Sequence, residues 1–172
     1  KLFALINNGA YGQPGAVEDL SRALLRDQFE TNLFGTHELT CRLLPVLRAQ
    51  GSGRIIQISS VLGLVSLAYR GAYNASKFAL EGLSDTLRLE LAGSGIHVVL
   101  IEPGPIESRF RQNAYAAFKA NIDREHSAYR EYYIKVERRL AGSKNQPFTL
   151  PPEAVLKKVV RALVAGRPKP RY

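Results

Sequence analysis

Ser60, Tyr73 and Lys77 carry the strongest chemical signal in the sequence. Tyr73 and Lys77 stand four residues apart in a stretch that predicts a helix, so their side chains share one face of it. A phenol has a pKa near 10, and a neighbouring ammonium favours its ionised form. Lowering that pKa to about 7 takes about 3 units, or roughly 4 kcal/mol, of which Lys77 can supply part. Ser60 can hydrogen-bond a substrate oxygen, so the three residues suit the holding and protonation of an alkoxide.

The Tyr-x-x-x-Lys spacing by itself is weak evidence. With 8 Tyr and 8 Lys in 172 residues, chance gives about 8 × 8/172, or roughly 0.4 occurrences, and a second pair, Tyr115 and Lys119, is present. The residue thirteen positions before Tyr73 is Ser60, whereas Glu102 precedes Tyr115 by the same interval. We therefore interpret Tyr115 as a packing or lid residue.

Apolar runs alternate with helical stretches along the chain. The sequence predicts strands at 2–6, 54–59 and 97–102, and helices at 17–50, 72–92, 109–141 and from Pro151 to Gly166. This alternation is typical of a parallel α/β sheet with right-handed crossovers. In such sheets ligands bind beyond the carboxyl ends of the strands. We therefore expect the residues that follow the three strands, at 7–9, 59–60 and 102–104, to share one cleft.

Composition narrows the class of protein. A chain of 172 residues suits one domain, and 45% apolar with 23% charged residues excludes collagen, a disulfide scaffold and a disordered chain. No run approaches eighteen apolar residues, so no membrane span is predicted. A single cysteine, Cys41, excludes an internal disulfide, and the three histidines lack ligand spacing, so we expect no metal site.

Positive charge is concentrated in the last third of the sequence. Residues 1–108 hold 9 basic and 10 acidic residues, whereas residues 109–172 hold 15 and 5. Such asymmetry can indicate binding to nucleic acid or to an anionic membrane. A non-catalytic basic binding module is therefore an alternative to an enzyme. No nucleic-acid-binding motif is present, so we interpret the charge as a solvated helical surface and expect no nucleic-acid partner.

Taken in order, these motifs resemble the short-chain dehydrogenase/reductase family. The resemblance implies an α/β fold, a Rossmann-like doubly wound parallel sheet, in a single domain over 1–172 with a helical substrate lid over 109–150. It implies strands 4 to 6 of the family sheet and the start of strand 7. Strands 1 to 3 and the glycine-rich pyrophosphate loop are then lacking, so we expect a piece of a longer chain that does not fold stably alone.

The resemblance also assigns roles to individual residues. Ser60, Tyr73 and Lys77 fall on the family's catalytic positions, and Asn32, in Glu-Thr-Asn-Leu-Phe-Gly, falls on the Asn that kinks its helix and supports a proton relay. The turn Asn-Asn-Gly-Ala departs from the family's Asn-Asn-Ala-Gly by one exchange. The implied cofactor is NAD(P)(H), with the choice between NAD and NADP open. Its implied contacts are Asn7, Asn8, Tyr73, Lys77, Pro103, Gly104, Ile106 and Ser108.

The implied activity is hydride transfer between NAD(P)(H) and a small-molecule carbonyl or alcohol substrate, with Tyr73 as general acid–base. An epimerase or dehydratase of the same fold is the alternative within the family. The resemblance further implies a cytoplasmic homodimer or homotetramer that pairs through the helices at 17–50 and 72–92.

Overall fold

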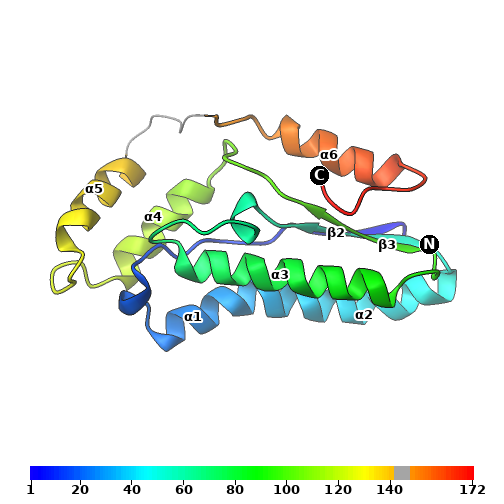
Figure 1. Ribbon diagram of the computed structural model, residues 1–172, viewed down its shortest axis with the longest axis horizontal. Helices are drawn as coiled ribbons and strands as arrows, with labels where there is room; N and C mark the ends of the chain where they lie inside the picture. The colour runs from blue at the N-terminus through cyan, green and yellow to red at the C-terminus, as the bar shows by residue number, and fades with distance from the viewer. Residues whose placement is uncertain (142–147) are drawn as a thin grey trace.

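A computed structural model describes residues 1–141 and 148–172 (Figure 1). Its centre is a parallel sheet with the order β1-β2-β3, formed by β1 (Ala4–Asn7), β2 (Gly53–Ile58) and β3 (Ile96–Ile101). Leu5, Ile55 and Val98 stand in register across the three strands. The strands thus lie within two residues of the ranges that the sequence predicts, and all three carboxyl ends meet at one edge of the sheet.

Helices cover both faces of the sheet. Three of them, α1 (Arg22–Phe29), α2 (Gly35–Gln50) and α3 (Gly71–Glu90), lie on one face, and α6 (Glu153–Val164) lies on the other (Figure 1). Short helical turns occur at Val17–Asp19, Glu30–Phe34 and Val61–Gly63, the second being π-helical. Within residues 1–141 and 148–172, every helix falls short of the length or the apolar character of a membrane-spanning segment.

The prediction of a continuous helix over 17–50 is wrong at the start of this range. Leu20 is extended, and α1 begins only after Ser21, whose hydroxyl accepts a hydrogen bond from the Leu24 amide at 3.2 Å. A serine in this position satisfies an N–H group that lacks a partner inside the helix. The π-helical turn at Glu30–Phe34 then separates α1 from α2.

The apolar runs form strands because both faces of the sheet are covered. On the face of α2 and α3, Leu47 and Ile55 are fully buried in a cluster that includes Val98. On the face of α6, Ile56 and Val99 pack with Ala162. Strands buried on two sides have no polar positions to alternate with, which explains their near-continuous Ile and Val content.

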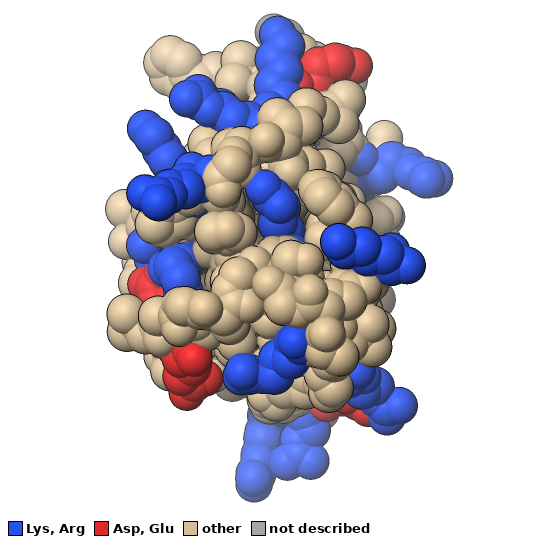
Figure 2. Space-filling model, turned by 90° about the vertical axis from the view of Figure 1, so that its right-hand side faces the viewer, with Lys and Arg blue, Asp and Glu red and all other residues tan. Residues whose placement is uncertain are grey.

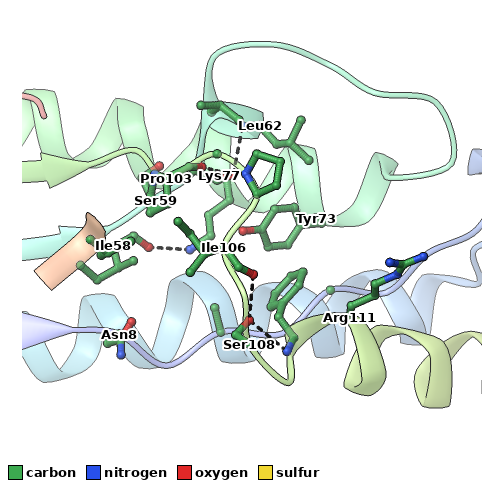
Figure 3. Close-up of a pocket in the computed structure, with 18 of the residues that line it drawn as sticks. Asn8, Ile58, Ser59, Leu62, Tyr73, Lys77, Pro103, Ile106, Ser108 and Arg111 are labelled. Atoms are coloured by element: carbon green, nitrogen blue, oxygen red, sulfur yellow. Dashed lines mark hydrogen bonds between the residues drawn. The ribbon is translucent and has the colours of Figure 1, made fainter. Parts of the chain in front are cut away.

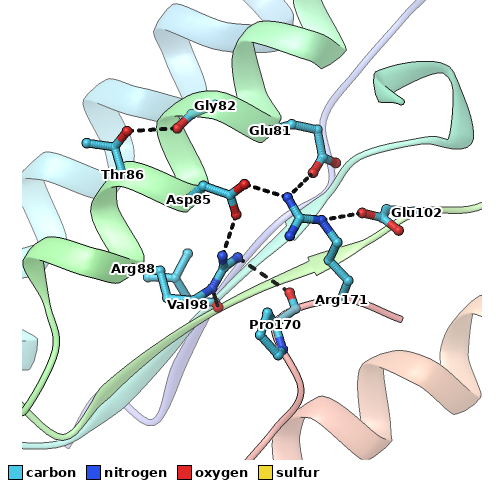
Figure 4. Close-up of polar contacts among 9 residues, drawn as sticks. All are labelled: Glu81, Gly82, Asp85, Thr86, Arg88, Val98, Glu102, Pro170 and Arg171. Carbon is cyan, nitrogen blue, oxygen red and sulfur yellow. Dashed lines mark hydrogen bonds and ion pairs between the residues drawn. The ribbon is translucent and has the colours of Figure 1, made fainter. Parts of the chain in front are cut away.

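The C-terminal residues extend this sheet beside β3. The Leu100 amide donates to the Pro170 carbonyl at 2.9 Å, and the Tyr172 amide donates to the Leu100 carbonyl at 3.1 Å. Between them, the Arg171 guanidinium lies among three carboxylates of α3 and the end of β3 (Figure 4): Glu81 at 3.2 Å, Asp85 at 2.6 Å and Glu102 at 2.9 Å. Arg171 thereby ties the last residues to the helix that carries Tyr73 and Lys77.

The segment expected as a lid contains two separate helices, α4 (Phe110–Asn121) and α5 (Arg130–Ala141), and its residues 142–147 lie outside the described residues. Tyrosines attach α5 to the body of the protein. The ring of Tyr132 stacks on Tyr69 with 3.8 Å between centroids, and the Tyr133 hydroxyl accepts from the Ala16 amide at 2.7 Å and bonds Asp19. This aromatic packing places α4 and α5 beyond the carboxyl edge of the sheet.

Basic side chains are spread over the face of the molecule that Figure 2 shows. Figure 2 shows the end of the molecule at the right of Figure 1, where Lys and Arg prevail over Asp and Glu. On this face they stand apart, separated by uncharged surface. The positive charge seen there is therefore a dispersed, solvated one.

We predict that Leu47→Ala destabilises the protein, whereas Leu89→Ala does not. Leu47 is 0% exposed and its side chain packs against Gly53, while Leu89 is 78% exposed near the end of α3. A buried Leu→Ala change costs about 2–5 kcal/mol, and an exposed one about 0.5 kcal/mol or less. Urea unfolding of the complete gene product measures both, and equal losses would contradict the placement of the core.

Candidate active site

A cleft of about 870 Å³ opens at the carboxyl edge of the sheet (Figure 3). Residues that follow all three strands line it, including Asn8 after β1, Ser60 after β2 and Pro103 after β3. Tyr73 and Lys77 reach it from the first turns of α3. Parallel strands bring these positions to one place although they are far apart in the sequence.

Lys77 is buried at the base of the cleft, with 2% of its surface exposed. Its Nζ donates a hydrogen bond of 2.7 Å to the carbonyl of Ile58, the last residue of β2 (Figure 3). Burial lowers the pKa of Lys77 to about 8, and the negative charge of Glu81 one turn later acts in the opposite direction. The ammonium is therefore mostly charged at neutral pH and held in a fixed position.

Tyr73 lies in the wall of the cleft, 8% exposed, with its ring edge-on to Phe110 at 5.3 Å between centroids. Glycine at position 12 permits this pair, because a Cβ there would lie 2.9 Å from the Phe110 ring. Burial raises the pKa of Tyr73 above its usual 10, and the Ser60 side chain and the Arg70 charge lower it in part. The sequence predicts a lowered pKa; in the structure burial outweighs the neighbouring groups, and the phenol keeps its proton at neutral pH.

Ser60 is held by the loop that follows β2. Its Oγ accepts a hydrogen bond from the Leu62 amide at 3.1 Å and lies 3.5 Å from the Pro103 carbonyl. The same side chain interacts with the Tyr73 phenol. Ser60 and Tyr73 thus present two hydroxyl groups to one region of the cleft, as the polarisation and protonation of a substrate oxygen require.

Asn32 and Asn7 are not among the residues that line the cleft. Asn32 sits in the π-helical turn, where its Oδ1 accepts from the Tyr11 amide at 3.1 Å and its Nδ2 donates to the Ser76 Oγ at 3.1 Å. The Asn7 Nδ2 donates to Gln57 at 2.9 Å. In this structure both amides secure the segments around the cleft.

The remaining expected contacts line the end of the cleft nearest the sheet. Asn8, Pro103, Gly104, Ile106 and Ser108 all belong to its wall. The Ser108 Oγ accepts from the Phe110 amide at 3.3 Å, next to the start of α4. This end therefore combines an apolar surface with an amide and a hydroxyl.

The cleft wall also contains residues that the sequence did not predict, among them Arg70, Phe110 and Arg111. Arg70 precedes Tyr73 by three residues, a spacing that places both on one side of the helix and offers a local signal. For Phe110 and Arg111 no local signal exists, since only the fold brings α4 to Tyr73. Tyr115, of the second Tyr-x-x-x-Lys pair, is not part of the cleft wall and lies beneath the Lys119 ammonium, 4.6 Å from its ring centroid.

Comparisons with known proteins agree with this geometry. The family profile for short chain dehydrogenases matches residues 1–119. The uncharacterised oxidoreductase YbbO of Escherichia coli K12 is 45% identical over 171 residues, which cover 99% of this chain and 58% of that protein. The NADPH-dependent 3-dehydrocapnine reductase of Ornithobacterium rhinotracheale is 36% identical over 99% of this chain and 60% of its own length. The chain thus spans somewhat more than half the length of these relatives.

A solved structure of a short-chain dehydrogenase from Streptomyces avermitilis superposes with a TM-score of 0.80 and 34% identity, covering 100% of this chain and 60% of that one. This similarity confirms the Rossmann-like α/β fold that the sequence predicts. With a family profile over more than two-thirds of its residues, the chain belongs to the short-chain dehydrogenase family.

Proposed function

We propose that this protein is an NAD(P)(H)-dependent oxidoreductase that interconverts a carbonyl compound and its alcohol. One observation carries the proposal: Ser60, Tyr73 and Lys77 meet at the carboxyl end of β2, with the ammonium of Lys77 fixed on the Ile58 carbonyl. The names of the relatives, an oxidoreductase and an NADPH-dependent reductase, support it.

The sheet end of the cleft fits a nicotinamide nucleotide. Ile6, Ile58 and Ile106 supply apolar surface against which a flat ring can lie, and the Lys77 ammonium and Ser108 hydroxyl supply hydrogen-bonding groups for ribose hydroxyls and a carboxamide. Bound there, the nicotinamide supplies or accepts the hydride. Asn8, Pro103 and Gly104 complete this proposed binding surface, and binding experiments decide between NAD and NADP.

Tyr73 is the proposed proton donor in reduction. As hydride reaches the carbonyl carbon, the oxygen gains negative charge, and the phenol transfers its proton to that oxygen while Ser60 donates a hydrogen bond to it. The phenolate left behind is stabilised by the positive charges of Lys77 and Arg70. In the oxidation direction the same groups remove the alcohol proton. Proposed supporting roles for Asn32 and Asn7 are to secure the segments that frame the cleft.

We propose that one domain, residues 1–172, carries this site and that its segment 109–150 forms the substrate side. From α4, Phe110, Arg111 and Ala114 contribute to the cleft wall. At the far end of the segment, the Leu150 amide donates to the Pro105 carbonyl at 3.0 Å. The segment thus closes back onto the loop that follows β3.

The first prediction about function concerns Tyr73→Phe in the complete gene product. Loss of the phenolic hydroxyl removes the proton donor, so the rate of carbonyl reduction should fall about 10²–10⁴-fold, while the Kd for NAD(P)H changes less than about twofold. Tyr115→Phe is the matched control, because Tyr115 belongs to the second Tyr-x-x-x-Lys pair and lies outside the cleft wall. Full activity in Tyr73→Phe, or its loss in Tyr115→Phe, would refute the assignment. Assays with a panel of aldehydes and ketones also show whether NAD(P)H is consumed, which an epimerase or dehydratase would not do.

A second prediction concerns Lys77→Met and pH. The folded protein holds the pKa of Lys77 at about 8 against an ordinary 10.5, so between these pH values the unfolded chain binds more protons. The wild type therefore gains stability from this residue as pH rises from about 8 to 10.5, and the Met variant does not. We expect the free energy of unfolding of Lys77→Met relative to wild type to fall across this range. The exposed Lys119→Met serves as control, and parallel pH profiles for all three proteins would show that folding does not lower the pKa of Lys77.

A third prediction concerns assembly. We propose a homodimer or homotetramer that pairs through α2 and α3, which lie side by side on one face of the sheet and expose the apolar side chains of Leu39, Val46, Phe78 and Leu83 (Figure 1). Light scattering of the complete gene product should give two or four times the subunit mass, and Leu83→Glu should reduce it to one. The exposed Gln112→Glu on α4 should leave assembly intact. A wild-type mass of a single subunit would contradict the proposal.

A further inference from the structure

The described wall of the cleft holds more cations than carboxylates. Four charged residues belong to the described wall of the cleft: the cations Arg70, Lys77 and Arg111, and the carboxylate Glu107. Lys77 is fixed at the sheet end by the Ile58 carbonyl. The two remaining cations, Arg70 and Arg111, lie towards the other end of the cleft. The body of the substrate lies there if the cofactor occupies the sheet end.

Each of these two arginines is close in sequence to one member of the Tyr73–Phe110 pair. Arg70 immediately precedes α3, one turn before Tyr73, and its charge lowers the pKa of the Tyr73 phenol, so it acts on the proposed reaction centre. Arg111 follows Phe110, whose ring touches that of Tyr73. In Figure 3, Arg111 lies on the opposite side of Tyr73 from Ile58 and Lys77.

The positions of the arginines in their helices strengthen the local positive potential. Arg70 is at the N-cap of α3 and Arg111 is in the first turn of α4, and neither helix has an acidic residue in its first turn. A cation at a helix N-terminus is unfavourable, because it adds to the positive end of the helix dipole. An anion between these helix ends would offset both charges. Both arginines also interact within the protein, and five N–H donors on each guanidinium leave room for a bound anion as well.

The wall of the cleft also contains apolar side chains. Leu62, Leu67 and Ala114 line the cleft together with Phe110. Such a wall favours an apolar substrate body by burial, and the arginines favour a negative group attached to it.

We propose that Arg70 and Arg111 form a subsite for the anionic group, a carboxylate, sulfonate or phosphate, of a substrate whose apolar body carries the reacting carbonyl. The subsite rests on the proposed function, since it takes the reacting oxygen to lie at Tyr73. The arginines bind the remote anion and determine specificity, whereas Ser60 and Tyr73 act on the carbonyl.

The test compares matched substrates in the complete gene product with NADPH and NADH. Straight-chain ω-oxo carboxylic acids of four to twelve carbons are assayed beside their methyl esters, which keep the aldehyde and the chain and remove only the charge. We expect kcat/KM for the best acid to exceed that of its ester about 10-fold or more, the discrimination expected of a charge-assisted hydrogen bond. In Arg70→Gln/Arg111→Gln the ratio should fall to about 1.

The decisive readout is kcat/KM for the acid divided by kcat/KM for its ester. Any effect of Arg70 on the reactivity of Tyr73 changes both values equally and cancels in this ratio. Arg109→Gln is the matched control, since it removes the same charge beside the start of α4 but does not line the cleft, and it should keep the wild-type ratio. Acids no better than esters at every length, or a preference that survives the double substitution, would overturn the subsite and leave the reductase intact. Failure to reduce any acid or ester would overturn the subsite, and failure on the whole panel of aldehydes and ketones as well would overturn the proposed function.

Discussion

The hydrogen bond from the Lys77 ammonium to the Ile58 carbonyl is the contact on which the site depends. A buried cation needs a partner, and the carbonyl at the end of β2 supplies one at 2.7 Å. This contact joins the first turns of α3 to the strand end. Tyr73 lies one turn before Lys77 and Ser60 lies two residues after Ile58, so a single bond fixes the relative positions of both hydroxyl groups. The parallel register of β1, β2 and β3 then brings the loop at Pro103 to the same edge.

Burial shapes the acid–base chemistry of this site in two directions. It lowers the pKa of Lys77 to about 8 and raises the pKa of Tyr73 above its usual 10. The phenol thereby keeps its proton near neutral pH, as the proposed proton donor must, and Lys77 keeps most of its charge, as the proposed stabilisation of the phenolate requires. Ser60 and Arg70 oppose the rise in the phenol's pKa. In our proposals Arg70 acts both on the Tyr73 phenol and on the anionic group of the substrate, and these two roles link the proposed chemistry to the proposed substrate class.

Patterns within short stretches of the sequence predicted the three strands and the meeting of the residues at the carboxyl edge of the sheet. The strands followed from Ile and Val runs buried on both faces, and the meeting of Ser60 with Tyr73 and Lys77 followed from helix spacing and from the strand-end rule. Contacts between residues far apart in the sequence determined the other features of the site. The family resemblance implied a kink at Asn32, but no local rule did, and the π-helical turn there accompanies bonds to Tyr11, 21 residues away. The pKa of Tyr73 is raised by burial, and one of the groups that pack on its ring is Phe110 of α4, 37 residues further along the chain. No local pattern indicates which residues of α4 enter the cleft.

The central claim is that one substrate oxygen is held by Tyr73 and Ser60 above the fixed ammonium of Lys77. A crystal structure of the complete gene product with oxidised cofactor and an alcohol that it turns over tests this most directly. The account predicts that the alcohol oxygen lies about 2.6–3.2 Å from both the Tyr73 phenol oxygen and the Ser60 Oγ, with the Lys77–Ile58 bond retained. An alcohol oxygen bound to other side chains, with Tyr73 directed away from it, would contradict the account.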